Sequence, residues 1–285
     1  MIADIILVTI AVVWVLAACI SDIKSKEVPD WLSYSLIALA LGVRFIYALT
    51  YSQWFFFLYG VAGLVIAFVV GALFYYSHIW GGGDSKLLMG LGAIFATAPF
   101  FVTSSIPFFV VILTNILIFG AIYGLIWALV LFVINYKKVL IEAAKVFTET
   151  VYLRYILVVC SVIAVAMIPF MDEMLSRIFL VILAVILLLY YVLFIFIRAL
   201  ERTVMYKRLL VSKLVVGDWV AKPVKVGNRI ICSERDYGLT QKQIIELKHN
   251  GVKYVLIKDG MIFVPAFVFG LIFSLVFGDI LFLLF

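Results

Sequence analysis

Long apolar runs, separated by short polar breaks, dominate the chain. An α-helix needs about 20 consecutive and mostly apolar residues to cross a bilayer. The pattern predicts eight such helices, over residues 2–20, 31–49, 54–79, 86–98, 106–135, 155–171, 178–197 and 262–285. The fourth run is short because Pro99 follows it, so we expect this helix to tilt or to lie in a locally thinned bilayer.

Small and polar residues inside the runs indicate how the helices pack. Gly63, Ala67 and Gly71 recur every four residues in the third run, which places them on one face suited to close helix packing. Arg44 and Asn115 also lie inside runs, where we expect them to face partner helices or to reach the interface. The first run lacks a basic start and a small-residue cleavage site, so we expect it to be retained as a span.

One stretch before the last run has a different composition. Residues 201–260 hold 12 of the 22 Lys and Arg residues of the chain. We interpret this stretch as a small soluble α+β domain from four local signals: a Gly217–Asp218 turn within the β-prone run 211–226, a Thr240–Gln243 capping box, a helix end at Asn250–Gly251 and a strand over 252–257. The basic surface of such a domain suits solvent, anionic lipid or a substrate.

The overall composition agrees with this pattern. Of the 285 residues, 67% are hydrophobic and 13% are charged, and the mean hydropathy is +1.26. These values exclude an ordinary soluble globular protein. We therefore predict an all-α polytopic membrane protein of about eight transmembrane helices, with a small α+β domain before the last helix. We divide it into a transmembrane core over 1–200, a soluble domain over 201–260 and a final transmembrane helix over 261–285.

The residue types that serve metal and redox chemistry are few and scattered. Cys19, Cys160 and Cys232 show no CxxC spacing, so we expect packing roles and neither a disulfide framework nor a zinc site. His78 has no second His or Cys at ligand spacing. The pI is near 9.1, but the many Phe and Tyr residues suit lipid-facing and interfacial positions. We expect no metal, no cofactor and no nucleic-acid partner.

The distribution of basic residues predicts the orientation. With the N-terminus outside, the cytoplasmic segments are 21–30, 80–86, 136–154 and 198–260, which hold 20 of the 22 Lys and Arg residues. Such an excess is typical of the cytoplasmic side. We expect a multi-pass protein of the plasma membrane with a cytoplasmic soluble domain. In this orientation Asp22, at the end of the first helix, and Asp84, at the start of the fourth, lie at one cytoplasmic boundary.

Two carboxyl groups at one membrane boundary suggest a catalytic pair. An acid near hydrocarbon is a functional candidate, and Asp84 follows Gly81, Gly82 and Gly83, which permit a tight bend or the close approach of another chain. When two carboxyl groups lie close together, one keeps a proton, so the pair can activate a water and polarise a carbonyl. Such a pair titrates as a unit, so base and acid are not assigned to single residues. The residues alone leave open that both aspartates only end helices at the interface.

The sequences around both aspartates resemble a known family. Residues 81–84, Gly-Gly-Gly-Asp, match the GxGD motif of membrane aspartyl peptidases, and their continuation to Gly90 resembles the type IV prepilin peptidase branch. Residues 22–29, with an Asp, two Lys and a Pro, resemble the first aspartate motif of that branch. Both motifs occur in the family's order, two spans apart. The resemblance implies that Asp22 and Asp84 are the catalytic residues.

Within this family the chain resembles the archaeal prepilin and preflagellin (class III signal) peptidases. Bacterial members carry an early cytoplasmic domain with paired CxxC motifs, whereas only a short polar break follows the first run here. The late soluble domain before a final helix is similar to the archaeal form. The two runs within 155–197 depart from the six-span preflagellin peptidase, which favours a dedicated pilin peptidase.

The resemblance implies a membrane aspartyl endopeptidase that removes the short basic leader of type IV pilin-like precursors at the cytoplasmic membrane face. Within the same mechanism, the alternative substrate is an archaellin precursor. The expected partners are therefore pilin-like or archaellin precursors and membrane lipid.

Several neighbouring residues are candidates to support this reaction. Glu27 and Asp30 are candidates to attract the basic leader, although a helix start explains Asp30 equally well. Lys86 is a candidate to bias the charge of Asp84 or to contact lipid phosphate, or it only extends to the interface. The glycines at 81–83 are candidates to dock substrate backbone or to let the fourth helix move. We also consider hydrogen bonds to the aspartates from the hydroxyl groups of Ser21 and Ser85.

Two other functions remain as alternatives. An ion- or proton-coupled transporter would place acids in the middle of the membrane, in spans related by an internal repeat, and neither feature is visible. A catalytically inactive scaffold of the same family is opposed only by the presence of both aspartates.

Overall fold

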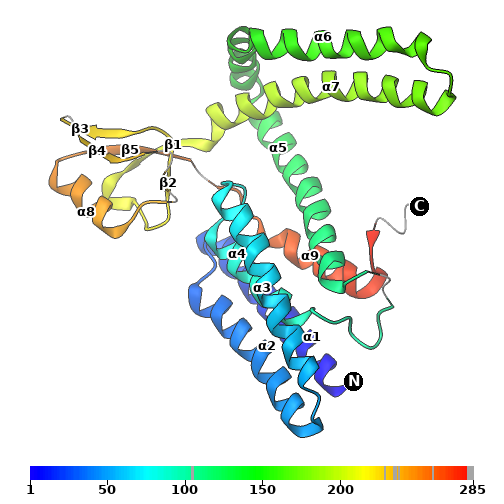
Figure 1. Ribbon diagram of the computed structural model, residues 1–285. Coiled ribbons are helices and arrows are strands. Elements are labelled where there is room, and N and C mark those ends of the chain that lie inside the picture. The colour runs from blue at the N-terminus through cyan, green and yellow to red at the C-terminus, as the bar shows by residue number, and fades with distance from the viewer. Residues whose placement is uncertain (104–105, 228, 234–235, 237, 259, 281–285) are drawn as a thin grey trace. The chain divides into compact units, whose positions relative to one another are not determined.

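The computed structural model of the chain describes residues 1–285 apart from 104–105, 228, 234–235, 237, 259 and 281–285 (Figure 1). The helices are α1 Ile2–Ser25, α2 Asp30–Tyr51, α3 Trp54–Tyr76, α4 Gly82–Ile94, α5 Phe108–Glu149, α6 Val151–Met167, α7 Met174–Leu200, α8 Gln241–His249 and α9 Val264–Phe277. The strands are β1 Tyr206–Leu210, β2 Trp219–Val220, β3 Val224–Val226, β4 Arg229–Cys232 and β5 Tyr254–Lys258.

The polytopic helical architecture is confirmed, and each of the eight predicted runs overlaps one α-helix, although residues 281–285 of the last run lie outside the described residues. In the part of the chain that the structure describes, six helices are long and apolar enough to cross a membrane, namely Ile2–Ser25, Asp30–Tyr51, Trp54–Tyr76, Phe108–Glu149, Val151–Phe170 and Met174–Met205. The other two, α4 and α9, have 13 and 14 residues. A helix of 13 residues is about 20 Å long, against about 30 Å for the hydrocarbon core of a bilayer. One end of α4 therefore falls short of the opposite membrane surface.

The described chain forms two compact units. The first comprises Met1–Leu125 with Gly260–Phe285, and the second comprises Ile126–Asp259. The helix α5 contributes to both, and its backbone leaves helical geometry at Asn135 (φ −119°, ψ 21°). Most of the polar segment 136–154, for which the sequence predicted no secondary structure, continues as helix to Glu149.

The first unit depends on the close packing of α3 against α4. The residues Gly63, Ala67 and Gly71 are buried on one face of α3, which confirms the predicted small-residue stripe. A Cβ on Gly63 would overlap the Gly92 carbonyl oxygen of α4, and a Cβ on Gly92 would overlap Ala67. The absent side chains let the two helix backbones nearly touch, which fixes the position of α4.

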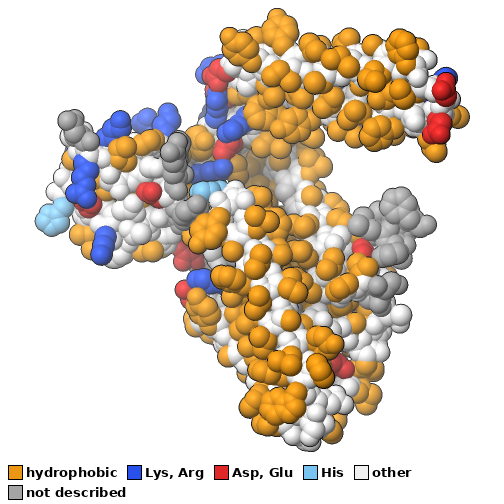
Figure 2. Space-filling model, in the orientation of Figure 1, with side chains coloured by type: hydrophobic (Ala, Val, Ile, Leu, Met, Phe, Trp, Pro, Cys, Tyr) orange, Lys and Arg blue, Asp and Glu red, His pale blue; other side chains and the backbone are white. Residues whose placement is uncertain are grey.

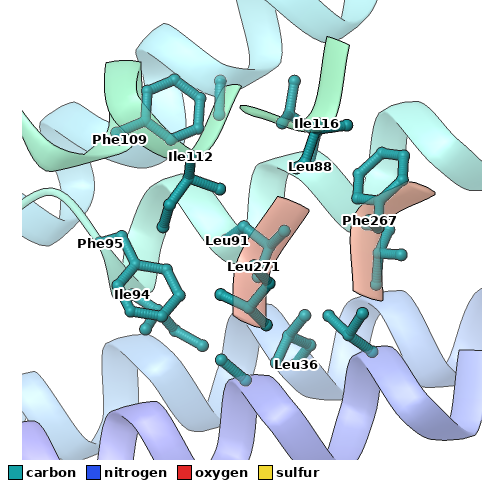
Figure 3. Packing of buried hydrophobic residues seen from close by; sticks show 14 of the residues in the cluster. Leu36, Leu88, Leu91, Ile94, Phe95, Phe109, Ile112, Ile116, Phe267 and Leu271 are labelled. Carbon is teal, nitrogen blue, oxygen red and sulfur yellow. The ribbon is translucent and has the colours of Figure 1, made fainter. Parts of the chain in front are cut away.

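The core of the first unit joins α2, α4, α5 and α9. Figure 3 shows these side chains meeting between the helices, and they include Leu36 of α2, Leu88, Leu91 and Ile94 of α4, Ile112 and Ile116 of α5, and Phe267 and Leu271 of α9. Gly90 of α4 lies directly against Leu36 of α2. Most residues of α4 between Ser85 and Ile94 are thereby buried, although the helix is short.

In the second unit, α6 and α7 form an antiparallel pair. The Ser161 hydroxyl of α6 donates to the Ala184 carbonyl of α7 (3.1 Å). Many hydrophobic side chains on this pair are exposed, and hydrophobic side chains likewise cover the helices in the space-filling view (Figure 2). The exposed apolar surface fits a lipid environment. At the end of the pair, Arg202 forms ion pairs with Glu149 (2.7 Å) and Glu142 (3.5 Å) of α5.

The predicted α+β domain is also present. The domain has an antiparallel sheet with strand order β1-β5-β2 and a β3-β4 hairpin. Its core includes Val255 and Ile257 of β5 and Leu247 of α8. The Thr240 capping box is formed, and α8 ends at Asn250 before Gly251, whose φ is +69°. The run before the Gly217 turn is not a strand, however, because residues 211–213 form a 3₁₀ turn.

The buried cysteine of this domain has a packing role. Cys232 lies at the end of β4 within the domain core. Burial raises the pKa of its thiol above the usual value, with a smaller opposing effect from a backbone hydrogen bond. A thiol in this state is a poor nucleophile.

Candidate active site

The first aspartate lies in the last turn of the first helix, where the chain reverses. The helix α1 ends at Lys26, which has a left-handed backbone (φ 58°) and whose N–H donates to the Asp22 carbonyl. Ser21 and Ser25 donate their hydroxyl hydrogens to the Glu27 carbonyl (3.0 and 3.3 Å). These bonds fold residues 22–29 back on the helix end, and the Asp22 residue keeps only 7% of its surface exposed.

The carboxylate of Asp22 is held by the start of the last helix. Its Oδ2 accepts the backbone N–H groups of Phe263 and Val264, both at 3.1 Å. The first N–H groups of a helix have no partner within that helix, and they attract negative charge. The helix α9 has no side-chain cap of its own. Asp22 therefore supplies this cap from α1.

The second aspartate lies in the first turn of α4. Asp84 Oδ2 accepts the N–H of Gly81, the residue that precedes the helix, at 3.2 Å. The helix begins at Gly82, four residues earlier than the predicted run. The left-handed turn that precedes it is made by His78 (φ 57°) and not by a glycine, since Gly81 has φ −70°. At Gly83 the close neighbour is Val28 of the same chain, so the expected approach of another chain stays a prediction.

Contacts between the two aspartate segments bring the carboxyl groups together. A Cβ on Gly83 would lie 3.0 Å from the Val28 Cβ, a tight contact that would require a small shift, so glycine favours the close approach of α4 to the turn after α1. The Trp80 ring packs on Phe263 and Phe267, with centroid distances of 5.6 and 5.4 Å. The Asp22 and Asp84 carboxyl groups consequently lie within range of a direct electrostatic interaction.

The supporting candidates are placed differently from one another. The Lys86 ammonium forms an ion pair with the Asp30 carboxylate, which ties α4 to the start of α2. The Asp30 carboxylate is therefore already paired with a basic side chain of the protein, whereas the Glu27 side chain is exposed at the turn. Gly82 lies against the Tyr75 ring, and a Cβ on Gly81 would reach the Asp84 carboxylate at 3.4 Å.

The expectation that serine hydroxyl groups bind the aspartates is wrong. Ser21 donates to the Glu27 carbonyl, and Ser85 donates to the carbonyl groups of Gly71 (3.0 Å) and Gly81 (3.2 Å). Both hydroxyl groups bond backbone carbonyl oxygens, those of Glu27 and Gly81 beside the aspartates and that of Gly71 within α3. Their effect on the carboxyl groups is therefore through backbone position.

Three parts of the site were missed by sequence reasoning. They are the backbone N–H groups of Phe263 and Val264, the ring of Trp80, and Tyr123 of α5, which is near enough to Asp22 for an electrostatic interaction. Gly120 lies against Phe263, in the turn of α5 that precedes Tyr123. The sequence held one signal for the contribution of α9. Val264-Pro265 marks a helix start without a Ser, Thr, Asp or Asn cap, so its N–H groups need an acceptor from elsewhere.

The arrangement suits acid–base chemistry with two carboxyl groups. Like charges at short range keep one proton on the pair, and the backbone N–H groups favour the ionised form of the group they contact. Such a pair can deprotonate a water and hydrogen-bond a carbonyl in one step. Among the residues that the structure describes, no group of three or more His, Cys, Asp or Glu side chains is placed to hold a metal ion.

Both aspartates lie in a segment of the chain that matches a known protein family. Residues 9–129 match the Type IV leader peptidase family, and the segment includes both aspartates. The resemblance inferred from the two aspartate motifs is thereby confirmed over this part of the chain. No solved structure matches the chain.

Archaeal relatives match parts of the chain. A protein named preflagellin peptidase from Methanococcus voltae is 33% identical over 99 residues, which cover 34% of this chain and 41% of the relative. A preflagellin peptidase from Methanocaldococcus jannaschii is 28% identical over 85 residues, covering 30% of this chain and 36% of the relative. The matched segments thus span less than half the length of these relatives.

Proposed function

We propose, from the match of residues 9–129 to the Type IV leader peptidase family, that the chain is a membrane aspartyl endopeptidase. Its substrates are precursors of archaeal filament subunits with a short basic leader, and it cuts each leader next to the hydrophobic helix that follows. The observation that carries this proposal is that Asp22 of α1 and Asp84 of α4 lie near enough for their charges to interact, with Gly83 of α4 packed against Val28 of the turn after α1.

The reaction uses the two carboxyl groups as a unit that shares one proton. The ionised group removes a proton from a water, which attacks the scissile carbonyl carbon, while the protonated group donates a hydrogen bond to the carbonyl oxygen. The two N–H groups of α9 stabilise negative charge on Asp22 whenever that carboxyl group is the ionised one. Proton transfer to the leaving amine then breaks the peptide bond and returns the pair to its starting state.

The orientation follows from the basic residues. With the N-terminus outside, the C-terminal end of α1 and the start of α4 face the cytoplasm, together with the α+β domain. A basic leader is held at that face by the positive-inside rule, while the hydrophobic segment behind it enters the bilayer. The exposed carboxylate of Glu27 beside the site suits attraction of such a leader.

Two substrate classes fit this site. The archaeal relatives named preflagellin peptidase favour archaellin precursors. The additional α6–α7 pair, which lies beyond the matched residues 9–129, favours pilin-like precursors, as inferred from the number of spans. Both classes carry a short basic leader, so the same chemistry serves either.

A cleavage assay with both classes of precursor tests the proposal. The purified full chain in lipid nanodiscs is incubated with pilin-like and archaellin precursors, and the new N-terminus is identified by mass spectrometry. We expect cleavage directly before the hydrophobic segment, and loss of cleavage when the basic residues of the leader are replaced by Gln. The Asp22→Asn/Asp84→Asn double variant supplies the baseline.

The outcomes separate the competing functions. Cleavage at that position by the parent chain, but not by the double variant, supports the peptidase and identifies its preferred precursor. No cleavage of any precursor would reject the peptidase and favour a scaffold or a transporter. A proton or cation flux into liposomes that depends on Asp84 would then identify the transporter.

A further inference from the structure

The short helix that carries Asp84 is held at its opposite end by a buried arginine. Arg44 of α2 is fully buried, and its guanidinium donates to the Ile94 carbonyl at the C-terminus of α4 (2.7 Å). The same nitrogen donates to the Thr97 hydroxyl (3.0 Å), and the other terminal nitrogen donates to the Phe56 carbonyl of α3 (2.7 Å). One side chain therefore joins α2, α3 and the end of α4.

Further contacts fix the orientation of this guanidinium. It lies over the Phe56 ring, 4.3 Å from the centroid, and the charge of Asp4 of α1 acts on it electrostatically. Gly60 of α3 provides the necessary space, because a Cβ there would overlap the Arg44 Cδ. All four N-terminal helices thus contribute to the surroundings of one charge.

The position of this charge has a physical reason. Because α4 is about 10 Å shorter than the hydrocarbon core, its last carbonyl groups end where water is absent and need donors from the protein. A cation at a helix C-terminus also complements the helix dipole. Burying a guanidinium is costly, and its Nε–H has no hydrogen-bond partner among the described residues. In a membrane such a costly charge suggests a functional role.

We propose that Arg44 is a positioning residue that sets how far α4 extends toward the site, and thereby places Asp84 beside Asp22. The helix is rigid along its axis, so a shift at Ile94 moves Asp84 by a similar distance. The small-residue contacts of α3 with α4 resist separation of the two helices but resist sliding less. The two carbonyl contacts of Arg44 supply resistance to sliding. This inference rests on the proposed function only for its catalytic consequence.

The rate of disulfide formation between two introduced cysteines, here called the disulfide ruler, reports the position of α4 without any activity assay. Cysteines at Val28 and Gly83 would bring two Cβ atoms close together, because a Cβ at Gly83 lies 3.0 Å from that of Val28. Disulfides need Cβ atoms about 3.5–4.5 Å apart, so a small adjustment allows the bond. The ruler is built in a chain whose three native cysteines are replaced by alanine. We expect rapid oxidation with Arg44 present and at least about 10-fold slower oxidation with Arg44→Gln, because helix sliding separates the pair.

Matched variants separate positioning from general stability. Arg177→Gln removes an arginine that also donates to a carbonyl, that of Met171 in the second unit, and should leave the ruler unchanged. Gly60→Ala keeps the arginine but displaces its side chain, because a Cβ on residue 60 would overlap Arg44 Cδ. This variant should therefore also slow oxidation of the cysteine pair. Arg44→Lys keeps the charge but loses the two-armed contact, so we expect a partial effect. Thr97→Val removes one hydrogen-bond acceptor of Arg44. It takes the place of Arg44→Gln in these measurements if Arg44→Gln fails to fold.

Kinetics of leader cleavage give the catalytic consequence. We expect Arg44→Gln to lower kcat by about 10- to 100-fold with KM within about twofold, since a misplaced catalytic group affects the chemical step. Equal ruler rates and equal kcat in Arg44→Gln and the parent chain, with only a lower Tm, would overturn the positioning role. If the parent chain cleaves no leader, the ruler still decides whether Arg44 positions α4, so failure of the proposed function is recognised separately.

Discussion

Asp22, in the last turn of α1, accepts the backbone N–H of Val264, in the first turn of α9, at 3.1 Å. The two residues are 242 positions apart in the chain. This bond and the neighbouring one from Phe263 make the carboxylate both a candidate catalytic group and the cap of another helix. Structure and chemistry at Asp22 are therefore separable by substitution.

Replacing Asp22 by Ala should destabilise the fold more than replacing it by Asn. The Asn side chain retains an oxygen that can accept the N–H groups of α9, whereas Ala leaves both N–H groups buried without an acceptor. We expect Asp22→Ala to be less stable than Asp22→Asn by about 2 kcal/mol or more. Thermal unfolding of both variants in the same detergent checks this. Equal Tm values would mean that the α9 contact contributes little.

Glycine substitutions should distinguish the α3–α4 contact from an ordinary helix position. A Cβ on Gly63 would overlap the backbone of Gly92, so Gly63→Ala should cost about 1–3 kcal/mol and reduce activity through the position of α4. Gly42 of α2 has nothing within 4 Å of the corresponding position. Gly42→Ala should therefore be neutral or stabilising by up to about 1 kcal/mol. A similar loss of stability in both variants would contradict the close-packing account.

Charge substitutions near the site should affect leader binding unequally. Glu27 is exposed, so Glu27→Gln should raise KM for a basic leader several-fold at low salt, with the difference shrinking as salt screens the attraction. Asp30 is paired with Lys86, so Asp30→Asn and Lys86→Met should change stability similarly, by less than about 1 kcal/mol. Steady-state kinetics at two salt concentrations test both statements. A larger KM effect at Asp30 than at Glu27 would reverse the assignment.

The capping box of α8 allows a test of the α+β domain by itself. Thr240 accepts the Gln243 N–H and donates to the Gln243 side chain, so Thr240→Ala should cost this domain about 1 kcal/mol. Thr240→Ser retains the hydroxyl and is the control. Hydrogen exchange in β4 and α8 of the full chain should increase in the Ala variant only. Increased exchange in both variants would show that the hydroxyl is not the stabilising group.

The hydrophobic runs were sufficient to predict the helices, because bilayer length and apolar composition constrain each segment locally. The small-residue stripe of α3 and the burial of Arg44 against partner helices could likewise be predicted from residue type and spacing. The helical segment after Asn135 was not predicted. Its polar residues interrupt the hydrophobic run, and hydrophobic runs were the signal from which the helices were predicted. The Val211–Val216 run is rich in β-branched residues, yet it folds as a turn because it connects β1 to β2 at the edge of the core.

The candidate site was predictable in part. Asp22 and Asp84 each stand in a distinct local motif, and the distribution of basic residues placed both at one boundary. The contribution of Phe263 and Val264 lies in backbone groups, which carry no residue-type signal, and it requires the last helix to return to the first. Close approach at Gly83 was anticipated, but its partner Val28 is defined only by tertiary packing.

The central claim is that Asp22 and Asp84 act together on the leader, and single and double Asn variants test it most directly. We predict that Asp22→Asn and Asp84→Asn each lower kcat at least about 100-fold, and that the double variant is no slower than either. Asp172→Asn, at an exposed acid of the second unit, should retain the parent rate. Cleavage by either single variant at more than about a tenth of the parent rate, or a double variant whose loss is the product of the two single losses, would contradict a shared site.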